Sequence, residues 1–269
     1  MCRFWKVSRA AFYKGGARDL ARQGKEDSIL NAVKQIRCEQ PKLGTRKLFH
    51  ELRVHLAECG RGYGRDKFFT LLRNQNLLIK RKRKYAVTTN SRHPFYRYGN
   101  ELADQVITGP NKAWVSDITY LETEKGFAYL SLITDAYSRK IIGSHVDKSL
   151  GVEGTIKALN IALKQCNDTN GVIHHSDRGI QYCCKPYTKR LLDKGIKISM
   201  GEAGNCYDNA IAERVNGILK GEYMLDSRFK DIDHAVKATK QAVYLYNYKR
   251  PHWSLKFKKP AEVHDKIIK

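Results

Sequence analysis

The chain has 269 residues, enough for about two domains, and its 50 lysines and arginines against 27 aspartates and glutamates give a net charge of +23. The excess is concentrated in residues 1–100, which hold 24 basic and 7 acidic side chains, a net charge of +17. A folded chain with such a basic front half predicts contact with a polyanion, most commonly nucleic acid. The alternative, a solubilising surface, needs less charge than this.

Several classes of protein are excluded by what the sequence lacks. No apolar run approaches the ~20 residues of a membrane span, and the first residues have no apolar signal-peptide core. The seven cysteines are odd in number and contain no C-x-x-C pair, which indicates reduced thiols. No G-x-x-x-x-G-K-[ST] phosphate loop is present, which argues against an ATP-driven helicase. We therefore expect a cytoplasmic, nucleoid-associated protein.

The pattern of residues 1–84 predicts a small, basic, all-helical region the size of a helix-turn-helix module. Residues 1–26 show no clear pattern, whereas apolar residues recur at helical spacing from Asp27 to Cys38. Two further helices are expected after Thr45 and Asp66, which are good N-cap residues. A small bundle without any DNA-binding role remains the alternative.

A block of five consecutive basic residues follows these helices and then a segment without periodicity. The block consists of Lys80, Arg81, Lys82, Arg83 and Lys84. It predicts a solvated arm that binds DNA phosphates, since a nuclear-localisation role would need a eukaryotic context. Residues 85–111 mix Pro, Gly, Asn and Ser, which indicates a linker.

Residues 112–225 predict an α/β core. Strand patterns cover residues 113–121, 127–134, 140–146, 171–176 and 196–200, and helical patterns cover residues 152–166, 187–193 and 209–223. The resulting order, βββαβαβα, predicts a mixed sheet flanked by helices. A last helix, over residues 232–248, places residues 226–269 in a C-terminal helix and tail.

Three carboxylates lie where catalytic sites are commonly built. Asp117 lies inside the first strand, Asp177 ends the fourth, and Glu213 lies on the long helix. Carboxylates without an accompanying Cys/His set are typical ligands for Mg²⁺ or Mn²⁺. Each also has a structural alternative: a hydrogen-bond network, a turn and an exposed helix face, respectively.

The sequence motifs around these carboxylates resemble those of a known protein family. Asp177 and Glu213 are separated by 35 residues, and five ordered motifs surround the set: W-V-S-D-I-T-Y from residue 114, D-A-Y-S-R from 135, H-S-D-R-G-I-Q-Y from 175, D-N-A-I-A-E from 208 and Y-N-Y-K-R-P-H-W-S-L from 246. Together they resemble bacterial insertion-sequence transposases of the DDE type. These are downstream-frame (orfB) products whose catalytic core is similar to that of retroviral integrases. The resemblance covers nearly the whole chain.

This resemblance implies a fold and an activity. The fold is an RNase H-like mixed-sheet core preceded by a small all-α, helix-turn-helix-like domain. The activity is that of a polynucleotidyl transferase in which Asp117, Asp177 and Glu213 are catalytic and bind two Mg²⁺ (or Mn²⁺) ions. Such enzymes cut a phosphodiester at each end of the element, and the freed 3′-OH attacks another. Cut-and-paste transposition and a circular intermediate both remain open.

The implied partners are double-stranded DNA, from the transposon ends and the target, and further copies of the chain on that DNA. In the relatives, the active transposase is usually a frameshift fusion with an upstream helix-turn-helix and coiled coil. An upstream-frame (orfA-type) partner or fusion is therefore expected. Within the core, Lys220 lies about two helical turns after Glu213 and projects from nearly the same face. Lys220 and Arg178 are therefore the expected DNA contacts there, with a solvated lysine as the alternative at position 220.

Alternatives remain for other residues and for the function. Asp135 is expected to be a structural turn residue. His175 shares a strand face with Asp177, but a structural or solvent-facing histidine is expected there. The Arg250-Pro251-His252 segment either contacts DNA or docks the tail on the core. The functional alternatives are a non-catalytic repressor or domesticated remnant, and a simple metal-dependent nuclease.

Overall fold

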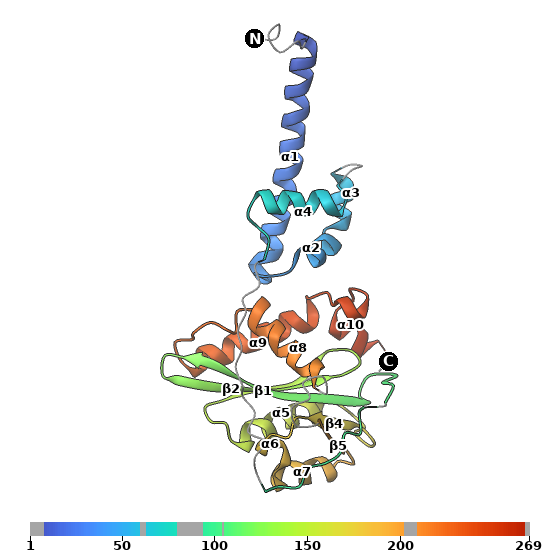
Figure 1. The fold of residues 1–269 in the computed structure, drawn as a ribbon, viewed down its shortest axis with the longest axis vertical. Helices are drawn as coiled ribbons and strands as arrows, with labels where there is room; N and C mark the ends of the chain where they lie inside the picture. Colours follow the sequence, from blue (N-terminus) through green and yellow to red (C-terminus); the bar gives the residue numbers. More distant parts are fainter. Residues whose placement is uncertain (1–7, 60–62, 80–93, 104, 202–208, 267–269) are drawn as a thin grey trace. The chain divides into compact units, whose positions relative to one another are not determined.

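The computed structural model describes residues 8–59, 63–79, 94–103, 105–201 and 209–266. The chain divides into two compact units, Met1–Lys80 and Arg81–Lys269. The first is helical and the second contains the sheet (Figure 1). The basic block Lys80–Lys84 lies outside the described residues.

The first unit packs short helices against the end of one long helix. Its helices are α1 (Arg9–Glu39), α2 (Thr45–Glu51), α3 (Arg53–Glu58) and α4 (Arg65–Asn74). Ile29 and Val33 of α1 are fully buried with Leu48, Phe68 and Leu72 from the other helices. An all-helical N-terminal region is thus present, as expected.

The boundaries of these helices differ from the expectation at three points. The first helix begins at Arg9 and not near Asp27, with the Ser8 hydroxyl accepting a hydrogen bond from the Ala11 amide at 3.1 Å. Most of its first twenty residues are exposed, so no apolar face marks them in the sequence. The expected N-caps at Thr45 and Asp66 are wrong, because glycines occupy the N-cap positions of α2 and α4.

A mixed five-stranded sheet forms the centre of the second unit. Its strands are β1 (Ala113–Thr123), β2 (Gly126–Asp135), β3 (Ile141–Asp147), β4 (Ile173–Ser176) and β5 (Lys197–Met200), in the order β3-β2-β1-β4-β5. The first three strands pair antiparallel, whereas β4 pairs parallel to β1 and β5 parallel to β4. The expected order of strands and helices is confirmed.

Helices cover both faces of this sheet (Figure 1). One face carries α5 (Val152–Gln165), α6 (Ile180–Cys183) and α7 (Lys185–Leu192), over a core that includes Trp114 and Leu159. The other carries α8 (Ala210–Glu222) and α9 (Ile232–Tyr248), over a core that includes Leu121 and Leu219. The short helix α6 was not expected from the sequence.

Segments on either side of the core also pack on it. Before β1, Phe95 and Tyr98 contact the Trp114 core, and the Met200 amide donates to the Gly99 carbonyl at 2.9 Å. After α9 come the short 3₁₀ helix η1 (Trp253–Leu255) and α10 (Pro260–Asp265). None of the helices in the described part of the chain is long and apolar enough to cross a membrane.

Candidate active site

The pairing of β1 with β4 directs two of the three carboxylates to one point. The strands run parallel with a constant offset of 60 residues, and their last pair joins Val115 to His175. Asp117 and Asp177 differ by the same 60 residues and stand two positions beyond that pair. Because side chains two apart on a strand share a face, both carboxylates continue the same row.

Asp117 is held by two hydrogen bonds. Its Oδ1 accepts from the Ile118 amide at 2.9 Å and its Oδ2 accepts from the Asn216 side chain at 2.7 Å. Burial, followed by the negative charges of Asp177 and Glu213, raises the pKa of Asp117 to about 7, although the hydrogen bonds oppose the shift. The charge effects show that the three carboxylates act on one another.

Asp177 is fixed by the turn that follows β4. Its Oδ1 accepts a hydrogen bond from the Gly179 amide at 3.0 Å. A Cβ atom at position 179 would lie 2.9 Å from that same oxygen, closer than real Cβ atoms come to their neighbours. A side chain at position 179 would therefore displace the Asp177 carboxylate from the position that the structure shows.

Glu213 reaches the same region from the first turn of α8. The helix is anchored to β1 at its start, because the Asn209 side chain donates to the Ser116 carbonyl at 3.0 Å and Ala212 packs in a cluster with Val115. Desolvation and the charge of Asp177 raise the pKa of Glu213. Asp177 thus acts electrostatically on both other carboxylates.

The chemistry of these side chains fits a hard divalent cation. All three offer carboxylate oxygens, which suit Mg²⁺ or Mn²⁺. Their mutual repulsion, visible in the raised pKa values of Asp117 and Glu213, is what a bound cation relieves. In the described ranges, no group of three His, Cys, Asp or Glu side chains is already close enough to hold a metal.

Comparisons with known proteins show the family to which the chain belongs. Two family models, both described as "Integrase core domain", match residues 107–206 and 194–260. The chain is 36% identical to the "Insertion element IS600 uncharacterized 31 kDa protein" of Shigella sonnei, over 99% of this chain and 98% of that protein. It is 32% identical to the transposase for IS629 of Shigella sonnei, over 90% of this chain and 80% of that protein. It is 31% identical to transposase InsF for IS3A of Escherichia coli K12, over 85% of this chain and 80% of that protein. The chain belongs to the insertion-sequence transposases with an integrase core.

A solved structure shows the fold of this family member. A chain of the simian T-cell lymphotropic virus intasome, solved with PP2A regulatory subunit B56 gamma, matches with a TM-score of 0.52 at 18% identity. The match covers 82% of this chain and 74% of that chain. The mixed sheet with helices on both faces is therefore the RNase H-like fold of a retroviral integrase core.

In this transposase family member, Lys220 lies on the helix of Glu213 and Arg178 directly follows Asp177. Lys220 follows Glu213 and Asn216 along one face of α8, and its Nζ lies 4.2 Å from the centre of the Tyr120 ring on β1. Arg178 is half-buried in the turn between Asp177 and Gly179.

Asp135 is a structural residue, as expected for a turn. It is fully buried, and its carboxylate accepts hydrogen bonds from the Ser138 amide and hydroxyl and from the Asn111 amide, at 2.6–2.7 Å. Burial alone raises its pKa, but hydrogen bonds from His264, Ser138 and Asn111 outweigh that effect and lower it. The carboxylate therefore holds the β2–β3 turn and the C-terminal segment together.

The two histidines before Asp177 are also structural, and the solvent-facing alternative is wrong. His174 is 1% exposed, and its Nε2 lies 2.7 Å from the Ser116 hydroxyl and 3.0 Å from that of Tyr187. His175 is fully buried, with Nδ1 2.8 Å from the Ser199 hydroxyl. The His174 ring therefore connects β4 to β1 and α7, and the His175 ring connects β4 to β5.

Arg250 docks the C-terminal tail on the core. Its side chain is 2% exposed, and its Nε and Nη2 each donate to an oxygen of Glu222 at 2.8 Å. Since Glu222 ends α8, this paired contact joins the tail to the helix of Glu213. The question left open for residue 250 is thereby answered in favour of docking.

Asn216 is the site residue that the sequence analysis missed. It lies three residues after Glu213 and is 6% exposed, with its amide on Asp117. Its spacing from Glu213 and Lys220 places all three on one helix face, which is the only signal the sequence contains. An asparagine at such a position has many other uses, so the spacing alone does not identify it.

Proposed function

We propose that this chain catalyses the cutting and joining of DNA strands at the ends of an insertion sequence. Water attacks a phosphodiester and releases a strand with a 3′-OH. That hydroxyl then attacks a second phosphorus, so one P–O bond forms as another breaks and the leaving 3′-oxygen takes up a proton. The observation that carries the proposal is the continuation of the β1–β4 register to Asp117 and Asp177, with Glu213 within electrostatic reach of both.

Asp117, Asp177 and Glu213 are the residues that would hold two Mg²⁺ or Mn²⁺ ions. Bound ions supply activation of the attacking oxygen and stabilisation of the leaving oxygen. The chain's own contribution is to orient the carboxylates. Asn216 fixes one oxygen of Asp117, and the Gly179 amide fixes one oxygen of Asp177. Metal ligands positioned in this way by neighbouring hydrogen bonds lose less entropy on binding.

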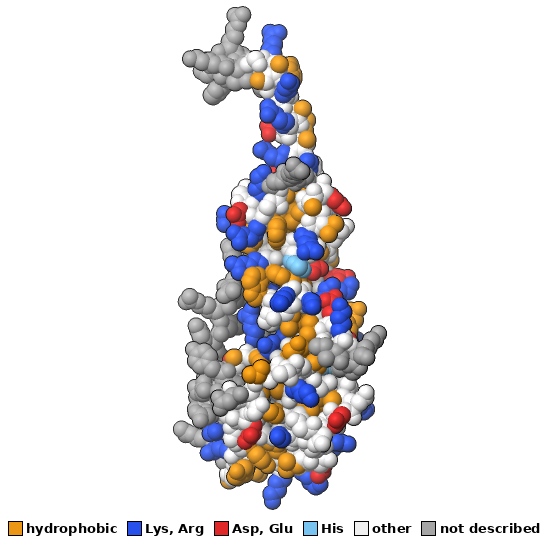
Figure 2. Space-filling model, turned by 90° about the vertical axis from the view of Figure 1, so that its right-hand side faces the viewer, with side chains coloured by type: hydrophobic (Ala, Val, Ile, Leu, Met, Phe, Trp, Pro, Cys, Tyr) orange, Lys and Arg blue, Asp and Glu red, His pale blue; other side chains and the backbone are white. Residues whose placement is uncertain are grey.

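DNA binding is assigned to basic residues at two levels. Lys220 and Arg178 contact phosphates next to the reacting bond, whereas Lys80–Lys84 bind the backbone without regard to sequence. Lys and Arg side chains also outnumber acidic ones along α1, by seven to four, and are prominent along it in Figure 2. We propose that further copies of the chain and an upstream-frame partner or fusion complete the complex on double-stranded DNA.

The test is a strand-cleavage and joining assay on DNA that carries the element's ends. Wild type is compared with Asp117→Asn, with Mg²⁺, with Mn²⁺ and with EDTA, in the presence of the upstream-frame product. Wild type is expected to release 3′-OH ends and to join them to a target only with metal. The Asp117→Asn variant is expected to bind the same DNA and to lose both reactions.

A matched control separates the site from general effects of charge. Asp193→Asn neutralises an exposed carboxylate at the end of α7, where it pairs only with Lys189 among the described residues, and should keep wild-type activity. Equal activity of wild type and Asp117→Asn would show that the catalytic residues are wrongly assigned. DNA binding without any cleavage or joining in wild type would favour the non-catalytic repressor.

A further inference from the structure

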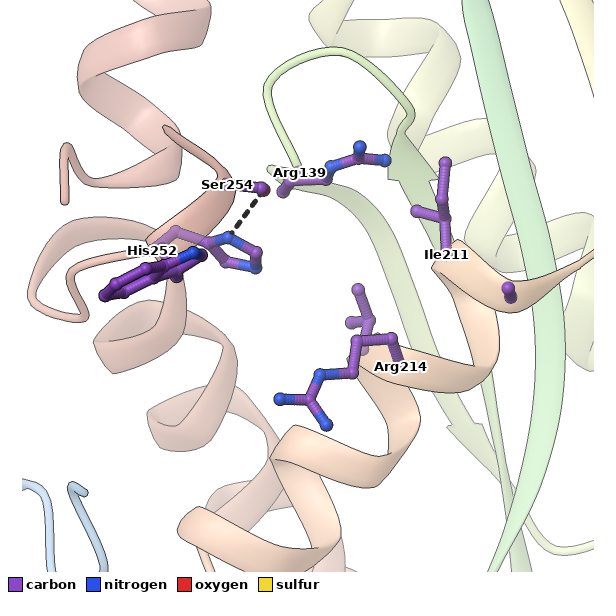
Figure 3. A pocket seen from close by; sticks show the side chains of 8 residues that line it. Arg139, Ile211, Arg214, His252 and Ser254 are labelled. Carbon is purple, nitrogen blue, oxygen red and sulfur yellow. Dashed lines mark hydrogen bonds between the residues drawn. The ribbon is translucent and has the colours of Figure 1, made fainter. Parts of the chain in front are cut away.

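A pocket with an unassigned role opens beside the N-terminal half of α8 (Figure 3). It has a volume of about 330 Å³. Three segments far apart in the sequence line it: the β2–β3 turn, α8 and the tail after α9. Its principal lining side chains are Arg139, Ile211, Arg214, His252, Trp253 and Ser254. Both arginines belong to the lining, and none of the described residues that line it is a carboxylate.

The positive charge of the pocket is only partly offset within the described part of the chain, where the charge of Asp135 acts on Arg139. Neither Arg139 nor Arg214 forms an ion pair with any carboxylate described there. The Nη1 atom of Arg139 is buried and has no hydrogen-bond partner among the described residues, and desolvation lowers the pKa of this guanidinium. Because this atom is buried, Arg139 offers little of its guanidinium to a ligand, whereas Arg214 is exposed and can contact an anionic group in the pocket.

The backbone places Arg139 at the pocket by a strained conformation. Its φ is +63°, in the left-handed region that non-glycine residues rarely adopt. The turn is held by the hydrogen bonds from Ser138 and Asn111 to Asp135 and by the Arg139 amide on the Asp135 carbonyl at 2.9 Å. Strain of this kind persists where the surroundings fix it, and it concentrates at functional positions.

The tail supplies a flat aromatic wall. Trp253 is 62% exposed, and its ring lies 5.1 Å from that of Phe257 at an angle of 76°. The loop between them is closed by two backbone hydrogen bonds, from the His252 amide to the Lys258 carbonyl and from the Phe257 amide to the His252 carbonyl. The Ser254 hydroxyl lies 3.0 Å from Nδ1 of His252, which fixes that ring (Figure 3). The wall is thus rigid before any ligand arrives.

The pocket and the carboxylates share α8. Arg214 directly follows Glu213, so the two side chains point about 100° apart around the helix. A DNA strand that crosses the first turns of α8 can therefore reach both. A base inside a duplex is already stacked between its neighbours, whereas an unpaired base can stack on the exposed ring of Trp253 with its phosphate on Arg214.

We propose that this pocket binds one unpaired nucleotide of the DNA, with its base against Trp253 and His252 and its phosphate on Arg214. The proposal rests on the proposed function, since it takes DNA as the ligand. An acidic peptide is less suitable because a carboxylate would pair with Arg214 but leave the aromatic wall and Ile211 without a partner. The pocket therefore selects DNA whose strands are locally unpaired.

The test compares two labelled DNAs by fluorescence anisotropy, with the full chain in EDTA so that no cleavage occurs. One is a blunt duplex, and the other is the same duplex with a three-nucleotide single-stranded extension. Wild type is expected to bind the extended DNA at least about 10-fold more tightly, as loss or gain of base stacking typically changes affinity by this order. Trp253→Ala and Arg214→Ala are each expected to abolish that preference and to keep the affinity for the blunt duplex.

Matched controls are Tyr244→Ala and Lys240→Ala, which remove an exposed aromatic ring and an exposed cation from α9 outside the pocket lining. Both should retain the preference. A 2-aminopurine in the extension gives a second readout, because stacking on Trp253 quenches its fluorescence in wild type and not in Trp253→Ala. The proposal is overturned if wild type binds both DNAs equally, if Trp253→Ala keeps the preference, or if hexaglutamate displaces the extension.

These experiments can contradict one of the two proposals without contradicting the other. If the preference is present but no strand is cut or joined with metal, the proposed function falls and the nucleotide pocket stands. If cutting depends on Asp117 but the preference is absent, only the pocket proposal falls.

Discussion

Asn216 on α8 donates its side-chain amide to Oδ2 of Asp117 on β1 over 2.7 Å. The two residues are 99 positions apart in the chain, and the bond joins the helix that carries Glu213 to the strand that carries Asp117. Asn216 is 6% exposed, and its own side-chain oxygen has no hydrogen-bond partner among the described residues. The bond therefore fixes the orientation of one carboxylate relative to another.

Replacing Asn216 with alanine should impair the site without unfolding the protein. Asp117 loses the donor that orients it, and loss of such a neighbour typically costs 10- to 100-fold in metal affinity or activity. We expect the rate of strand joining to fall by about that factor and half-maximal activity to need more Mg²⁺. Asn160→Ala on α5 is the control. A wild-type Mg²⁺ dependence in Asn216→Ala would remove Asn216 from the site.

The contact between Arg250 and Glu222 should make a large contribution to stability. Arg250→Ala leaves a partly buried carboxylate without its partner, so the free energy of unfolding should fall by about 3 kcal/mol. Urea denaturation followed by circular dichroism measures the difference. Lys189→Ala removes a fully exposed pair with Asp193 and should cost less than about 1 kcal/mol. Equal losses in the two variants would contradict the docking role of Arg250.

Stability should depend on pH through His174. Burial, and next the neighbouring charge of His175, lowers the pKa of His174 to about 3 in the folded protein, against an ordinary value of 6.5. Between these values the unfolded chain binds a proton that the folded protein does not, so stability falls as the pH falls below 6.5. The loss from this residue is about 2 kcal/mol between pH 7 and pH 5.

The variant His174→Gln isolates this effect, because it removes the titration and leaves the other groups in place. Urea denaturation at both pH values should give a smaller pH dependence for the variant than for wild type. The expected gap is that same ~2 kcal/mol. Identical pH dependence in the two proteins would mean that His174 accepts a proton in the fold.

Neutralising Lys80–Lys84 should weaken binding to all DNA sequences to a similar extent. Cations that neutralise phosphates release counter-ions, so the slope of log affinity against log salt should shrink by about 1 for each phosphate that the variant no longer neutralises. Binding to the element's ends and to unrelated DNA, measured at several salt concentrations, tests this. An unchanged slope would remove the block from the DNA-binding surface.

The arrangement of the core follows from patterns that a single sequence contains. The strands alternate or run apolar over their observed lengths, and the order βββαβαβα limits the sheet to a few topologies. The 60-residue interval between Asp117 and Asp177 equals the register of two parallel strands. The interval is informative because a shift of one residue in either strand would turn its carboxylate to the opposite face of the sheet.

Features that depend on distant contacts were not predictable in the same way. The role of Asn216 depends on a strand 99 residues away, and the Arg139 pocket combines three separate segments. The N-terminal half of α1 was missed for a local reason, since its exposed residues need no apolar stripe. Sequence patterns indicate which residues are buried. They therefore do not reveal polar sites that several elements assemble, or helices that bury few of their residues.

The docking of Arg250 on Glu222 also has a consequence for the order in which the core is completed. Glu222 and Glu213 belong to the same helix, but the cation that neutralises Glu222 is among the last residues of the described chain to be synthesised. The end of α8 therefore acquires this paired contact only when the tail that follows α9 has been made. Completion of the helix that carries Glu213 is thereby linked to the C-terminal part of the described chain.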